Sequence, residues 1–143
     1  VRPHVAVFGR KDYQQLFVIR ELVAQLNYPV RIVGVETRRD PDGLAMSSRN
    51  GYLSAPERAE AVRLTRNLEA VVAAIRSGRR DFDALCESAT ADLTGAGWRV
   101  DYVAVRNRSR LAVPQAGDRD LVVLGAAWLG RTRLIDNREA DSP

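Results

Sequence analysis

The sequence contains only one cysteine, Cys86, and only one histidine, His4. A single cysteine excludes an internal disulfide framework and is typical of a reducing compartment, so we expect a cytoplasmic protein. One histidine and one cysteine are too few for a conventional zinc cluster, and we expect no protein-built metal site. No apolar run approaches the length of a membrane span, and none has the character of a signal-peptide core. We therefore expect no membrane partner.

What the chain does have is an ordinary globular composition with a basic excess. Its 143 residues are 45% apolar and 28% charged, which suits one average domain or two small pieces of something larger. It begins at Val1 without a methionine, and we expect it to be part of a longer protein. The net charge of +4 and the pI near 9.8 favour anionic partners, either nucleotides or nucleic acid.

The first 35 residues or so have the pattern of a parallel crossover unit. An apolar run at 4–8 predicts a buried strand, and a second run at 30–35 predicts another. The helix between them is expected to begin at Asp12, with Gln15 completing a capping box, and to end at 27–29. Strand, helix and strand at this spacing indicate α/β structure.

The turn between the first strand and the helix is a candidate ligand site. Such a turn presents unpaired backbone N–H groups and the positive end of the helix dipole. Gly9 permits close approach of a ligand, and Lys11 adds a full charge. The alternative is a plain turn with exposed basic residues, because these residues match no strong phosphate motif.

Residues 37–53 show no periodicity and include two glycines and a proline, so we expect a domain boundary near 37–43. Asp40 and Asp42 are carboxylates that suit Mg²⁺, although the pattern favours turn formation. Ser47, Ser48 and Arg49 follow in a polar loop that could reach phosphate oxygens. Many surface loops share this composition.

The remainder predicts two helices and a small sheet. One helix is expected from Ser54, with a capping box to Glu57, to about residue 77, and a second from Asp81, with Cys86 on its apolar face as a core residue. These helices should pair antiparallel. Strands are expected at 98–106, 121–127 and 132–137, the last two joined through Gly130-Arg131, and residues 138–143 should be loose. This part is α+β.

Five segments in this order resemble the pantothenate synthetase (pantoate–β-alanine ligase) family. They are Phe8 to Leu16, Ile32 to Val35, Asp42 to Leu53, Ala126 to Gly130 and Arg133 to Asn137. The resemblance implies that the chain is the C-terminal half of such an enzyme. Residues 1–40 would end a Rossmann-like nucleotide-binding domain, and residues 41–143 would form a small C-terminal lid domain. The missing N-terminal half would be its partner, and the complete protein could form a homodimer.

The resemblance also implies a two-step reaction with ATP and Mg²⁺. The pantoate carboxylate attacks the α-phosphate of ATP, which gives pantoyl adenylate and pyrophosphate. The amine of β-alanine then displaces AMP to form pantothenate. The first step needs cancellation of charge on the phosphates, and the second needs the adenylate shielded from water.

The family's binding residues can be carried over to matching positions. The turn at Gly9, Arg10, Lys11 and Asp12 would lie along ATP, with Lys11 directed to the phosphates. Gln15 would hydrogen-bond pantoate, and Arg38 would touch the nucleotide through its backbone. Met46, Ser47, Ser48 and Arg49 would correspond to a mobile loop like the Lys-Met-Ser-Lys-Ser loop of class I aminoacyl-tRNA synthetases. The residues implied in catalysis are Lys11, Ser47, Ser48 and Arg49.

Three positions depart from the family pattern. Arg10 stands where the family usually has Glu, Glu36 where it has Pro, and Arg38 where it has a small apolar residue. The extra positive charge could tighten triphosphate binding or disturb the placement of adenosine.

We expect the chain alone to be catalytically inactive, since much of the ATP site would lie in the missing half.

Two further functions remain open besides that of a ligase fragment. A basic α+β module that binds nucleic acid is the alternative, although no RNA-recognition motif is present. A folding unit kept only for structure is the third possibility.

Overall fold

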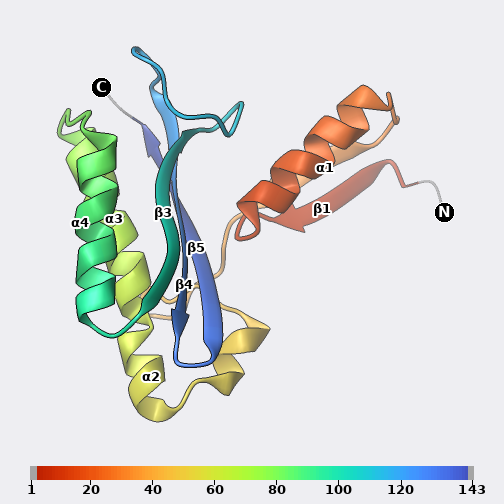
Figure 1. Ribbon diagram of the computed structural model, residues 1–143. Coiled ribbons are helices and arrows are strands. Elements are labelled where there is room, and N and C mark those ends of the chain that lie inside the picture. The colour runs from red at the N-terminus through yellow and green to blue at the C-terminus, as the bar shows by residue number, and fades with distance from the viewer. Residues whose placement is uncertain (1–2, 142–143) are drawn as a thin grey trace. The chain divides into compact units, whose positions relative to one another are not determined.

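The structure is a computed structural model that describes residues 3–141 (Figure 1). The chain divides into two compact units, Val1–Arg38 and Arg39–Pro143. None of the helices within residues 3–141 has both the length and the apolar character needed to cross a bilayer.

The first unit is the expected parallel crossover, but its first strand is not buried as predicted, because Val5 and Val7 are exposed. Strand β1 (Val5–Gly9), helix α1 (Tyr13–Gln25) and strand β2 (Arg31–Val35) follow in order. The strands pair in parallel from Val5 opposite Arg31 to Gly9 opposite Val35. Gly34 lets α1 pack closely on β2, because a Cβ added there would lie 2.9 Å from Cδ2 of Leu16.

The predicted capping box at the start of α1 is wrong. Asp12 does occupy the N-cap position, but its side chain makes no capping hydrogen bond. Its backbone dihedrals, φ −86° and ψ 65°, lie outside the extended region from which a cap side chain reaches back to the first turn. The Asp12 carbonyl instead accepts the first helical hydrogen bond, from the Leu16 N–H.

The second unit is the expected α+β arrangement, two helices against an antiparallel sheet. Helices α3 (Val62–Arg76) and α4 (Phe82–Gly95) lie side by side on one face of the sheet (Figure 1). The sheet order is β3-β4-β5, with strands at Arg99–Asn107, Asp120–Leu129 and Thr132–Asp141. A 3₁₀ helix, η1 (Ser48–Tyr52), and a short helix, α2 (Ala55–Glu60), precede α3.

The structure corrects two boundaries in this unit. The helix expected over 54–77 is interrupted at Ala61, which separates α2 from α3. Residues 138–141 are not loose, because β5 pairs with β4 as far as Asp141, opposite Asp120. The buried methyl of Ala140 and ion pairs from Arg108 fix this end of the strand. Residues 142–143 lie outside the described residues.

The core of the second unit lies between the helices and the sheet. It contains Leu68, Val71 and Ile75 of α3, packed on Leu121 and Val123 of β4. Cys86 packs against the same cluster, half-buried, and burial raises the pKa of its thiol. A protonated, half-buried thiol agrees with the core role that the pattern predicted.

Replacing Ser54 with Ala is expected to lower the free energy of unfolding by about 1 kcal/mol. The Ser54 hydroxyl accepts a hydrogen bond from the Glu57 N–H, and the Glu57 carboxylate accepts one from the Ser54 N–H at 2.8 Å. The change removes the first of these bonds. Urea denaturation followed by circular dichroism measures the loss. Ser88→Ala on the exposed face of α4 is the control, and an equal loss in both variants would contradict the capping role.

Candidate functional site

The turn from Gly9 to Asp12 connects β1 to α1. Space beside Gly9 is open, since a Cβ added there would meet no described atom within 4 Å. The Arg10 N–H donates to the Val35 carbonyl at 2.8 Å, which ties the turn to the end of β2. Lys11 is half-buried and Asp12 is exposed. The backbone is thus held at the carboxyl end of both strands, where open α/β sheets receive their ligands.

Two of the departures from the family pattern form an ion pair. The Arg10 Nη1 lies 2.6 Å from Oε1 of Glu36, just beyond β2. The acidic side chain at 36 thus offsets part of the charge that Arg10 brings to the turn. The pair is solvent-exposed on the Glu36 side, so its contribution to stability is small.

The other expected binding residues of the first unit are open to solvent. Gln15 is exposed on the first turn of α1, and Arg38 is exposed at the last position of the unit. An amide on this turn can both donate and accept hydrogen bonds.

In the second unit, Arg39 fixes the segment that leads to the Met46–Arg49 loop. Its guanidinium makes two hydrogen bonds of 2.8 Å to the Asp136 carboxylate. It also donates to the carbonyls of Gly43 and Asn137. The Asp136 side chain is only 3% exposed, so this is a buried, bidentate pair. Arg39 was not among the predicted site residues, and the one sequence signal for its role is the carboxylate at 136 inside the strand expected over 132–137.

Asp40 and Asp42 form a turn whose carboxylates are both paired with Arg58. Arg58 contacts Asp42 at 2.7 Å and Asp40 at 2.9 Å. Asp42 also accepts from the Leu44 N–H at 3.2 Å, as turn-forming aspartates do. The hydrogen bond from Arg58 lowers the pKa of Asp42. Among residues 3–141, no group of three or more His, Cys, Asp or Glu side chains is placed to hold a metal ion.

The Met46–Arg49 segment enters η1 rather than remaining an irregular loop. Ser47 is the N-cap residue, and its hydroxyl oxygen accepts from the Arg49 N–H at 3.2 Å. Asn50 donates to the Ala45 carbonyl at 3.1 Å, which anchors the segment to the buried pair Leu44 and Ala45. Ser48 and the Arg49 side chain face solvent. One short, anchored turn therefore carries two hydroxyl groups and a guanidinium group that can contact a ligand.

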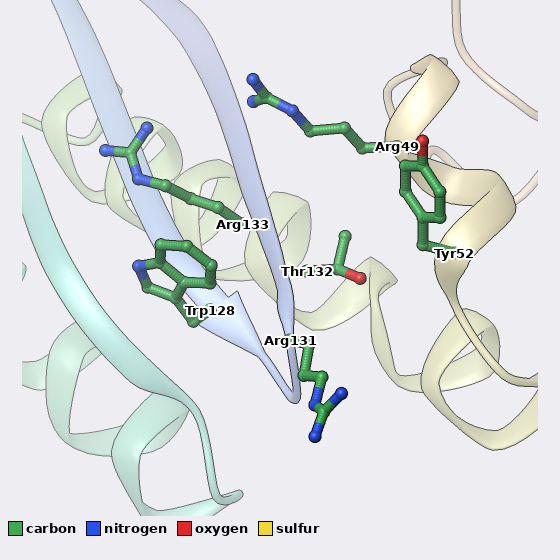
Figure 2. Close-up of a pocket in the computed structure, with 6 residues that line it drawn as sticks. All are labelled: Arg49, Tyr52, Trp128, Arg131, Thr132 and Arg133. Carbon is green, nitrogen blue, oxygen red and sulfur yellow. The ribbon is translucent and has the colours of Figure 1, made fainter.

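A basic pocket lies beside this turn and was not predicted from the sequence. Figure 2 shows the Arg49 and Tyr52 side chains of η1 on one side and the β4–β5 hairpin on the other. Its lining residues are Arg49, Tyr52, Trp128, Arg131, Thr132 and Arg133. No spacing rule joins residues about 80 positions apart, so only the fold could reveal the pocket.

The chain is similar to known pantothenate synthetases. A family model described as pantoate-beta-alanine ligase matches residues 1–139. Pantothenate synthetase of Thiobacillus denitrificans is 63% identical over 142 residues, which are 99% of this chain and 50% of that protein. The one from Chromobacterium violaceum is 57% identical over 139 residues, 97% of this chain and 50% of its own length.

A solved structure of the enzyme from Thermus thermophilus is 38% identical and superposes with a TM-score of 0.91, covering 100% of this chain and 51% of the other. This chain thus spans about half the length of the curated relatives it matches. The family match over residues 1–139 establishes common ancestry. The chain belongs to the pantoate–β-alanine ligase family.

Proposed function

We propose that the chain is the C-terminal portion of an ATP-dependent ligase that condenses pantoate with β-alanine through a pantoyl adenylate. The observation that carries the proposal is the family match over residues 1–139, which includes both candidate loops. A pantoate–β-alanine ligase from Francisella tularensis has been solved with β-γ ATP and β-alanine. Pyrophosphate leaves in the first step and AMP in the second.

The first unit supplies the turn at Gly9–Asp12. The α1 N-terminus directs the positive end of its dipole toward this turn, which favours phosphate oxygens. The positive charge of Lys11 stabilises the negative charge that builds up on the phosphates as pyrophosphate departs. Gln15, exposed on the first turn of α1, hydrogen-bonds pantoate through its amide. Arg38 contacts the nucleotide through its backbone.

The second unit supplies Met46, Ser47, Ser48 and Arg49. The hydroxyls and the guanidinium bind the triphosphate in the first step and the pyrophosphate that forms. Because the Asp40 and Asp42 carboxylates are bound by Arg58, Mg²⁺ enters as the counter-ion of ATP rather than on a site built by this chain. Closure of this unit shields the adenylate from water until the amine arrives.

We also propose that the first unit, as far as Arg38, belongs to the nucleotide-binding domain and the second unit to the lid domain, two residues earlier than the boundary at 40/41 that the sequence suggested, because Arg39 pairs with Asp136. Apolar side chains exposed in the first unit support this, because a two-stranded sheet with one helix leaves much of its apolar surface uncovered. The N-terminal half of the enzyme would cover this surface. The exposed residues are Val5, Val7, Val18, Leu22, Leu26, Tyr28 and Val35.

A chimera tests the proposal. This chain replaces the matching half of Thiobacillus denitrificans pantothenate synthetase, to which it is 63% identical, and pantothenate and AMP are measured. The chimera is expected to form both products, and the isolated chain neither.

Replacing both Ser47 and Ser48 of the chimera with Ala is expected to lower its kcat by about 10²-fold or more, because lost hydrogen bonds to developing charge have effects of that size.

The control for this experiment is Ser88→Ala on α4, which is expected to leave kcat unchanged. A folded chimera without activity, or full activity in the double Ser variant, would contradict the proposal. The nucleic-acid-binding alternative finds no support in the comparisons, and a filter-binding titration across salt concentrations tests it directly.

A further inference from the structure

The pocket beside η1 has a volume of 540 Å³ and an arginine-rich lining. The side chains of Arg49 and Arg131 have no hydrogen-bond or ion-pair partner among residues 3–141. Arg133 lies 2.6 Å from Asp101 through its Nε, which leaves its terminal nitrogens for another partner. Figure 2 shows Arg49 extending across the opening from η1 and Arg133 rising beside Trp128.

The charge around the pocket is net positive. Arg99 places its guanidinium over the Trp128 ring, 4.8 Å from the centroid, and adds a fourth cation to the three arginines that line the pocket. Two carboxylates lie close: Asp101, already paired, and Glu57, whose Oε1 lies against the position that a Cβ built on Gly130 would take. Because there are four guanidinium groups and only two carboxylates, the pocket carries a local excess of positive charge that attracts an anion.

The hairpin holds its arginines in fixed positions. Leu129 pairs with Thr132 across a two-residue turn, and Gly130 at φ +57° provides the positive dihedral that such a turn requires. Trp128 pairs with Arg133 in the ladder, so the ring and the guanidinium are direct cross-strand neighbours. The hairpin therefore fixes the backbone positions from which these arginine side chains extend.

We propose that this hairpin pocket binds a diphosphate group, with Arg131 and Arg133 as ligands additional to the Ser47–Arg49 turn. Guanidinium groups bind phosphate oxygens in a bidentate manner, and two that have unused donors suit two linked phosphates better than one carboxylate. The partly buried Trp128 ring lies beside these guanidinium groups. A nucleic acid would need a continuous basic groove, whereas this is a single pocket.

The diphosphate has two sources, free pyrophosphate or the terminal phosphates of a nucleoside triphosphate. The inference deepens the proposed function, because Arg49 belongs to both the phosphate-binding turn and this pocket. A diphosphate leaving the reaction would pass from the turn to the hairpin while Arg49 stays bound to it. Binding itself does not require the ligase reaction, so the two proposals fail separately.

Indole NMR signals of the chain test the inference. The sequence has two tryptophans: Trp98 is 3% exposed and donates to Glu60, whereas Trp128 lines the pocket. In the ¹⁵N-labelled chain titrated with pyrophosphate or ATP, the Trp128 Nε1–H signal is expected to shift saturably, and that of Trp98 to stay in place. Whichever ligand binds more tightly, free pyrophosphate or ATP, is identified as the source of the bound diphosphate. Trp128→Phe assigns the signals by removing one of them.

Two substitutions on the hairpin and one control sharpen the test. Arg131→Gln and Arg133→Gln are each expected to weaken pyrophosphate binding about tenfold, since each removes a charge-assisted contact. Arg76→Gln, an exposed arginine in the last turn of α3, removes the same charge and is expected to change binding less than about twofold. Absence of a saturable shift, an equal shift with sulfate at the same ionic strength, or equal weakening by Arg76→Gln would overturn the inference.

Discussion

Replacing Arg39 with Ala is expected to lower the free energy of unfolding of the second unit by about 3–5 kcal/mol. The substitution leaves the Asp136 carboxylate, 3% exposed, without its cationic partner. It also removes the hydrogen bonds that hold the carbonyls of Gly43 and Asn137. The cost of an unpaired buried charge is the reason for the large effect. Urea denaturation of the wild type and the variant measures it.

Two further variants decide whether the buried pair is the cause. Arg79→Ala breaks an ion pair with Asp81 in which both side chains are about half exposed, and it is expected to change stability by less than about 1 kcal/mol. Arg39→Met combined with Asp136→Leu removes both charges and should be less destabilised than Arg39→Ala alone. If Arg39→Ala costs no more than Arg79→Ala, the pair does not anchor this segment.

The second large effect is expected at Leu68 in the middle of α3. Leu68 is 0% exposed and packs in the cluster between α3 and β4. Leu68→Ala is expected to destabilise the unit by about 2–5 kcal/mol, through lost burial and the cavity that remains. Leu68→Met keeps the volume and should cost less than about 1.5 kcal/mol. Thermal and urea denaturation of both variants measure the difference.

Gly125 of β4 provides an internal check on this packing. A Cβ added at Gly125 would lie 3.0 Å from Cδ2 of Leu68 and 3.1 Å from Cδ1 of Leu64. Gly125→Ala should therefore destabilise the wild type by about 1–3 kcal/mol, and cost less in the Leu68→Ala background, where space has opened. Strictly additive effects of the two substitutions would show that the side chains do not compete for this space.

Local patterns in the sequence predicted most of the elements because each element carries its own signal. The crossover unit, the helix from Asp81 and the Gly130-Arg131 hairpin all appear where periodicity and turn chemistry place them. The capping box at Ser54 forms, whereas the one at Asp12 does not. The difference lies in backbone dihedrals at the two caps, which residue types alone do not determine.

Residues 138–141 show how tertiary context overrides a local reading. They lie near the C-terminal end of the sequence, where loose structure is expected. In the structure, each pairs with β4, and Arg108 forms ion pairs with Glu139 and Asp141. The buried neighbouring strand supplies the hydrogen-bond partners that make this polar segment a strand.

For the site, the sequence by itself determined the family and the residue types of the Gly9–Asp12 and Met46–Arg49 segments, because both are continuous stretches whose order carries the resemblance. Only the tertiary structure decided the long-range pairings. It joined Arg10 to Glu36 and Arg39 to Asp136, and it brought the β4–β5 hairpin beside Arg49. These contacts depend on strand register and helix packing over tens of residues, which composition and spacing do not specify.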